Sequence, residues 1–93
     1  MILDVLRVEV LVPDAQSLKD KRAVIKSLKE RMRGRFNVAV AEVEPNEKWQ
    51  RAKLGISTVG DERWVVERLL RQVTDWIRAS HEVALIQVDA EYL

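Results

Sequence analysis

A chain of 93 residues is long enough for one hydrophobic core and too short for two, so residues 1–93 are expected to form a single domain. Its 47% apolar and 33% charged residues, with three Gly and two Pro, exclude disorder, because disordered chains lack the apolar residues that offset the entropy of folding. The net charge of +1 excludes an overall strongly acidic or basic protein, and no apolar run approaches the ~20 residues that span a bilayer.

The first third of the chain predicts a strand followed by a helix. Residues 2–12 largely alternate apolar with other side chains, which is typical of a half-buried strand. Pro13 begins a turn, and Ser17 is a suitable helix N-cap with an acid three residues later. Apolar residues then recur at helical spacing, namely Leu18, Val24, Ile25, Leu28 and Met32. Gly34 is the expected end of this helix.

The remaining residues predict two strands, a helix and a last strand. Apolar alternation indicates strands at about residues 36–43 and 49–59, separated by a polar connection. A broad apolar face indicates a helix at about residues 62–79, and Asp61 is its expected N-cap. The last strand covers about residues 83–92.

Each predicted strand has one apolar face. In the last strand Ile86, Val88 and Ala90 are expected to face the core, which places Leu85 on the opposite face. Two strand–helix–strand units in series, each with one apolar strand face, point to helices packed on one side of an antiparallel sheet. The compact solution is a ferredoxin-like βαββαβ α+β fold, with two helices on one face of a four-stranded antiparallel sheet.

Side chains that carry out catalysis are scarce in this sequence. The single His, His81, falls in a predicted turn, where a solvated role is the usual one. Scattered Gly residues cannot form a phosphate-binding loop, and Glu42, Glu44 and Glu47 are interpreted as a solvated strand end. We therefore expect no enzyme, no cofactor and no bound metal. The absence of Cys and of a signal-peptide pattern favours the cytoplasm.

Positive charge is concentrated in the first helix. Between Lys19 and Arg35 there are eight basic and two acidic residues, so this segment carries +6 and leaves −5 for the rest of the chain. Five of the bases fall within a helical arc of roughly 80° at about 100° per residue, and we call them the basic stripe: Lys19, Arg22, Lys26, Lys29 and Arg33. The stripe would suit a phosphate backbone. Alternatively it is a solvated face, or one balanced by acids elsewhere in the fold.

Three further residues depart from simple patterning. Lys21 falls within the apolar arc of the first helix, where it either extends past the sheet edge into solvent or pairs with a carboxylate in a functional cleft. Trp64 lies opposite the apolar face of the second helix, as an interface anchor or as the partner of an Arg in a cation–π pair. Trp49, at the start of the third strand, packs on a loop or belongs to a subunit contact.

The outward face of the predicted sheet argues against base stacking on it. RNA-recognition modules of this fold stack bases on aromatic residues of the central strands, and the outward positions here include no aromatic residue. Ala39, Ala41 and Gly55, together with Leu3 and Val5, would instead suit a second layer of protein, such as the other subunit of a homodimer.

Several runs of the sequence resemble the bacterial YlxP-like family of unknown function. These are residues 12–22 (VPDAQSLKDKR), 35–38 (RFNV), 41–43 (AEV), 49–52 (WQRA) and 54–56 (LGI). The resemblance extends over essentially the whole chain. It implies a small ferredoxin-like protein, often encoded near translation and ribosome-maturation genes, without an established activity or catalytic residues. It further implies a motif-bearing surface that contains Ser17, Lys19, Lys21, Arg22, Trp49, Gln50 and Arg51.

The hypothesis that the sequence favours is a non-catalytic module that contacts RNA or a ribosomal assembly through the basic stripe and the region of Trp49 and Arg51. The alternative is a structural or regulatory homodimer, formed through the open sheet face, that binds a protein or small ligand without contacting nucleic acid. A third hypothesis, a small enzyme, requires a pocket around Lys21 with a neighbouring carboxylate.

Overall fold

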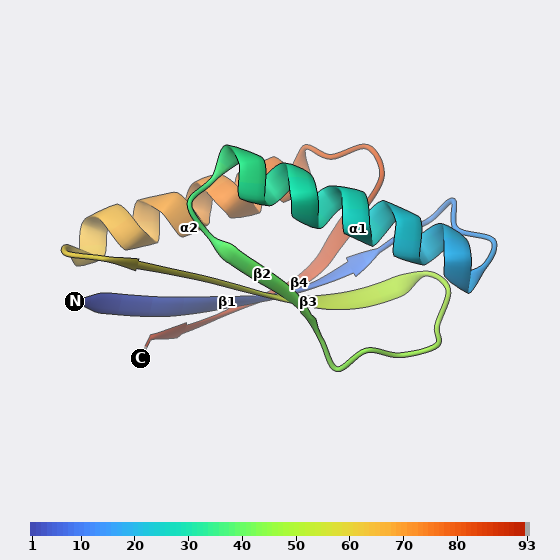
Figure 1. Ribbon diagram of the computed structural model, residues 1–93, viewed down its shortest axis with the longest axis horizontal. Helices are drawn as coiled ribbons and strands as arrows, with labels where there is room; N and C mark the ends of the chain where they lie inside the picture. Colours follow the sequence, from blue (N-terminus) through green and yellow to red (C-terminus); the bar gives the residue numbers. More distant parts are fainter. Residues whose placement is uncertain (93) are drawn as a thin grey trace.

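The computed structural model describes residues 1–92, with only the backbone described for Tyr92. The elements, in chain order, are β1 (Ile2–Leu11), α1 (Leu18–Arg35), β2 (Ala39–Val43), β3 (Arg51–Gly60), α2 (Arg63–Arg78) and β4 (Ala84–Tyr92). The strands form one antiparallel sheet in the order β2-β3-β1-β4. Both helices lie on the same face of this sheet (Figure 1). The ferredoxin-like α+β prediction is confirmed.

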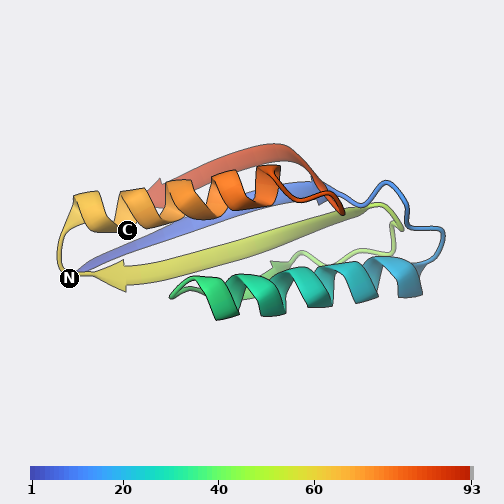
Figure 2. The ribbon, with the colours of Figure 1, turned by 90° about the horizontal axis from the view of Figure 1, so that it is seen from above.

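The core lies between the sheet and the helices. Its sheet side comes from alternate residues of the two central strands, for example Val8 and Val10 of β1 and Leu54 and Ile56 of β3, all of them buried. Each helix contributes one apolar stripe, because residues three and four apart share a helix face. The buried apolar residues of the helices are Ile25, Leu28, Met32, Val66, Leu70, Val73 and Ile77. Helix α1 covers the β2 side of the sheet and α2 the β1–β4 side (Figure 2).

A β-bulge in the last strand overturns the predicted orientation of two side chains. Glu9 pairs with Gln87 but the next residue, Val10, pairs with Leu85, so that β4 has one extra residue at this point. Leu85 therefore lies on the helix side, where it packs against the core, and Ile86 is exposed. A period-2 pattern cannot anticipate this change, because an extra residue shifts the phase of the alternation.

The first helix begins as predicted and ends differently. The Ser17 hydroxyl accepts a hydrogen bond from the Asp20 N–H at 3.0 Å, as expected of an N-cap. Gly34 does not terminate α1: its φ is not positive, and the helix continues through Arg35. The chain leaves the helix at Phe36, which is extended and packs its ring edge-on against Trp76 with centroids 6.0 Å apart. Aromatic packing, rather than glycine, thus sets the end of the helix.

The second helix begins one residue later than predicted. Its N-cap is Glu62, whose side chain makes no capping hydrogen bond, and Asp61 lies in the preceding turn. The helix therefore depends on burial of its apolar face rather than on a side-chain cap.

Replacing Gly34 by Ala tests its position inside the helix. A Cβ at this position has no atom within 4 Å, and alanine has the higher helix propensity. We expect Gly34→Ala to raise the free energy of unfolding by roughly 0.5–1 kcal/mol in urea denaturation. A decrease would mean that Gly34 adopts the left-handed conformation of a helix stop.

Candidate nucleic-acid interface

Four residues of the basic stripe have no partner in the described part of the chain. Lys19, Arg22 and Lys26 are exposed, and Lys29 is half-buried. None of these four side chains forms a hydrogen bond or an ion pair with any of residues 1–92. They lie on successive turns of α1 and span ten residues, or about 15 Å of helix.

The fifth residue of the stripe is engaged with the backbone. The Arg33 guanidinium donates a hydrogen bond to the carbonyl oxygen of Val40 in β2, at 2.8 Å. Since β2 is an outer strand of the sheet, this contact places the stripe along the β2 side of the molecule. Arg33 consequently offers fewer free donors to an external phosphate than the other four bases.

Two acids from the last part of the chain pair with bases outside the stripe. Glu82 pairs with Arg31 at 3.0 Å, on the flank of α1 that faces Trp76. Glu91 pairs with Arg7 at 3.2 Å, across the outward face of the sheet. These acids are therefore engaged away from the stripe.

Glu44, at the end of β2, likewise pairs with a base outside the stripe. Its carboxylate accepts a hydrogen bond from Lys53 Nζ at 3.0 Å, and that bond and the Lys53 charge lower the pKa of Glu44 below its ordinary value. Both side chains are largely exposed, so the pair contributes little to stability.

Lys21 is buried in the structure rather than part of a surface. The residue is 2% exposed, and its ammonium donates to the carbonyl oxygen of Asn46 at 3.1 Å, to Asn46 Oδ1 at 3.3 Å and to the carbonyl oxygen of Arg51 at 3.1 Å. It thus neither extends into solvent nor pairs with a carboxylate, and its place in the predicted motif surface is corrected. Three neutral oxygens satisfy the three N–H donors of the ammonium.

Gln50 joins the same loop to the one before α1. Its side-chain amide donates to the carbonyl oxygens of Pro13 at 3.2 Å and Ala15 at 3.4 Å. The backbone carbonyl oxygen of Gln50 accepts a hydrogen bond from the Val12 N–H at 2.8 Å. The two motif segments at residues 12–22 and 49–52 are therefore direct partners at one end of the fold.

The anchored loop presents an exposed aromatic ring beside basic residues. Trp49 is 56% exposed and precedes the exposed Arg51. Lys21 holds the loop that carries Trp49 against the first turns of α1, which include Lys19 and Arg22. The loop between β2 and β3 and the start of α1 lie at the same end of the molecule (Figure 1). This end combines positive charge with an aromatic surface.

Trp64 is placed at the other end of the molecule, at the start of α2 (Figure 1). The Arg68 guanidinium lies 5.2 Å from its ring centroid, and its indole N–H donates to the Glu62 carboxylate. The cation–π pair considered from the sequence is thus present. Trp64 is 58% exposed, and its exposed fraction is therefore close to that of Trp49. The two residues differ in their surroundings, because Trp64 lies on α2 and not beside the basic stripe.

Sequence reasoning missed Asn46, which provides two of the three acceptors of Lys21. Its side-chain oxygen also accepts from the Lys48 N–H at 2.8 Å, a local turn that Asn favours. The Asn in a polar connection was a signal for a turn. Nothing in the spacing linked it to a lysine 25 residues earlier.

Among residues 1–92, no three His, Cys, Asp or Glu side chains come together as a metal site. His81 is exposed and lines a shallow depression with Arg31, Trp76 and Glu82. No helix in the same residues has the length and apolar character needed to cross a membrane.

The chain belongs to a family described as "Protein of unknown function (DUF503)", whose model matches residues 3–90. It is also similar to "Uncharacterized protein YlxP" of Bacillus subtilis (strain 168), with 37% identity over 75 residues. The matched region covers 81% of this chain and 82% of that relative. The resemblance to the YlxP-like family is therefore confirmed.

Removing the Lys21 ammonium should destabilise the fold at its motif-bearing end. Lys21→Met keeps the apolar stem but removes the ammonium donor from the partly buried carbonyl oxygens of Asn46 and Arg51, so we expect a loss of roughly 2 kcal/mol in the free energy of unfolding. Lys26→Met, on the exposed side of the same helix, is the control and should change it by less than about 0.5 kcal/mol. Urea denaturation measures both. Equal effects of the two variants would contradict the anchoring role of Lys21.

Proposed function

We propose that the protein is a non-catalytic module that binds RNA, with the phosphate backbone along α1 and a base against Trp49. The observation that carries the proposal is the set of four unpaired bases on one face of α1, Lys19, Arg22, Lys26 and Lys29. Like charges this close repel one another, so the free protein is slightly destabilised by them. A polyanion removes this repulsion and releases its counterions.

Trp49 favours RNA over other polyanions. An exposed ring next to a basic surface stacks with an unpaired base, a contact typical of proteins that bind single-stranded regions. The loop that carries Trp49 is fixed by Lys21 and Gln50, so the ring is held in place before any partner arrives. Preorganisation of this kind lowers the entropic cost of binding. The outward sheet face, without aromatic side chains in the central strands, is not part of this proposed contact.

Neutralising two bases of the stripe should weaken RNA binding and reduce its salt dependence. Arg22→Gln with Lys26→Gln should reduce affinity about tenfold near 0.1 M salt and lower the salt slope by about 1.5. Fluorescence anisotropy of a labelled RNA with hairpin and single-stranded segments, over a series of salt concentrations, measures both quantities. Arg68→Gln with Arg71→Gln on α2 is the control of equal charge. Equal losses in the two double variants would contradict a specific role for α1.

Trp49 and Trp64 form a matched pair for testing base stacking. Trp49→Ala should weaken binding of single-stranded RNA by roughly 1–3 kcal/mol, while Trp64→Ala should leave it unchanged, because Trp64 lies at the start of α2, away from the basic stripe. The same anisotropy titration measures both variants. No difference between them would remove Trp49 from the interface.

The alternative is a homodimer formed through the open face of the sheet. Val59, 57% exposed, lies opposite Leu3 in the register of β3 and β1, and the small residues Ala41 and Gly55 pair further along the same face. Under this alternative, light scattering gives twice the monomer mass of 10.8 kDa, and Val59→Lys restores the monomer. A monomer at high concentration excludes the dimer and leaves the RNA proposal intact.

A further inference from the structure

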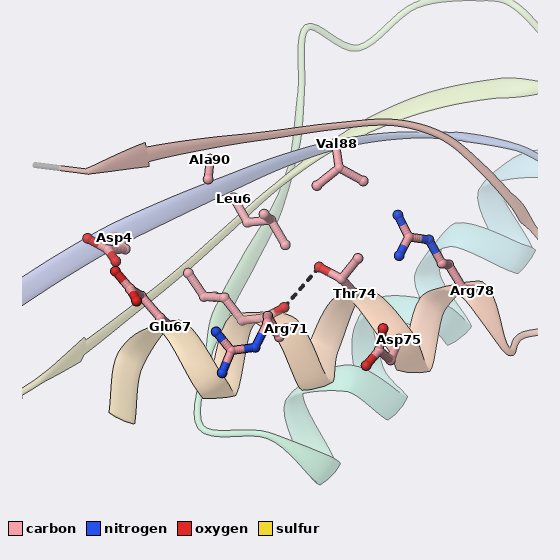
Figure 3. Close-up of a pocket in the computed structure, with 10 residues that line it drawn as sticks. Asp4, Leu6, Glu67, Arg71, Thr74, Asp75, Arg78, Val88 and Ala90 are labelled. Atoms are coloured by element: carbon pink, nitrogen blue, oxygen red, sulfur yellow. Dashed lines mark hydrogen bonds between the residues drawn. The ribbon is translucent and has the colours of Figure 1, made fainter. Parts of the chain in front are cut away.

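A second surface, remote from the basic stripe, contains a cavity. The cavity has a volume of about 370 Å³ and lies between α2 and the strands β1 and β4 (Figure 3). This volume falls within the range of small-molecule sites. Leu6, Val88 and Ala90 supply an apolar wall on the sheet side. Polar and charged side chains of α2 supply the opposite wall.

One end of the cavity contains a buried carboxylate without hydrogen-bond donors. Asp4 is 0% exposed, and neither of its carboxylate oxygens accepts a hydrogen bond from any of the residues described. Asp4 does have a charge partner, because Arg63 Nη1 lies 3.6 Å from Asp4 Oδ1 in an ion pair, but this distance is too long for an N–H···O hydrogen bond. A carboxylate in this condition is unfavourable to the fold.

The fold itself does not require an acid at this position. Asp4 lies on the helix side of β1, in phase with the buried Leu6 and Val8, where an apolar residue would be expected. Thr58, its cross-strand neighbour, donates its hydroxyl hydrogen to the Asn37 carbonyl oxygen instead. A destabilising group retained inside a cavity is a feature of binding sites.

The covering of Asp4 consists of partly exposed side chains. Glu67 points toward Asp4 from α2 (Figure 3), and Arg63 Nη1 lies 3.8 Å from the Glu67 carboxylate. Rotation of these long surface side chains would open Asp4 to the cavity without any change in the backbone. The carboxylates of Asp4 and Glu67 then both face this end of the cavity. This end of the cavity therefore favours a ligand cation that donates hydrogen bonds.

The rim farther along α2 is basic. Arg71 is one helical turn beyond Glu67, about 6 Å along the axis, and Arg78 lies further on, with Asp75 between them. The Thr74 hydroxyl donates to the Leu70 carbonyl oxygen at 2.9 Å, so only its acceptor capacity remains for a ligand.

We infer that this cavity binds a small, elongated zwitterion: an amine at Asp4 and Glu67, a short apolar chain against Leu6 and Val88, and an anionic group at Arg71. The unsatisfied Asp4 carboxylate gains N–H donors from the amine. This site is independent of the proposed RNA contact on α1.

Three simple probes test the chemistry of each end. Hexylamine contains the cation and the chain, 6-aminohexanoate contains both charges, and hexanoate lacks the cation. We expect 6-aminohexanoate to bind more tightly than hexylamine, and hexanoate not to bind. In an NMR titration of the wild-type protein, the shifts should centre on the amides of Leu6, Thr74 and Val88. Shifts elsewhere, or equal binding of all three probes, would overturn the site.

Two variants assign the ends of the ligand. Asp4→Asn should weaken hexylamine binding about tenfold while leaving the ligand-free protein at least as stable to heat, because a buried charge is removed. Arg71→Gln, at an exposed position, should remove the advantage of 6-aminohexanoate and leave hexylamine binding unchanged. A lower melting temperature for Asp4→Asn would show that Asp4 serves Arg63 structurally, and unchanged hexylamine binding would equally overturn the inference.

Discussion

The buried ammonium of Lys21 is the constraint on which one whole end of the molecule depends. It enters the apolar arc of α1, where a charge is unfavourable unless its donors are satisfied, and oxygens of Asn46 and Arg51 satisfy all three. This contact fixes the loop between β2 and β3 against the helix. Gln50 then secures the loop before α1. Among the motif residues, Lys21 thus lies beneath the surface, whereas Lys19, Arg22, Trp49 and Arg51 are exposed on it.

This framework separates the roles of neighbouring residues. The side chains of Lys21 and Gln50 donate hydrogen bonds to other parts of the chain. The adjacent Arg22, Trp49 and Arg51 are exposed to solvent. The net charge of the whole chain is close to zero, yet Glu91, Glu82 and Glu44 pair with bases outside the stripe. The local field, rather than the total charge, is what an approaching polyanion meets first.

Patterns of local sequence were sufficient for the element order and the core, because helical and strand periodicities report which side chains are buried. They failed where a distant contact decides the outcome. The end of α1 depends on Phe36 packing against Trp76, and the orientation of Leu85 depends on a bulge opposite Val10. For the candidate site, the stripe was visible from the sequence, but the acceptors of Lys21 were not. Asp4 could have been noticed as an acid in phase with Leu6.

The contact between Arg33 and β2 has a consequence for how copies of the protein can associate. An unlimited stack of sheets requires both outer strands to be available, since each copy must offer one edge to the copy before it and the other to the copy after it. Strand β2 is short, and the carbonyl oxygen of Val40 in this strand already accepts a hydrogen bond from Arg33. Arg33 therefore removes one acceptor from the edge that β2 would offer to a strand of another copy, and this makes edge-to-edge extension through β2 less favourable.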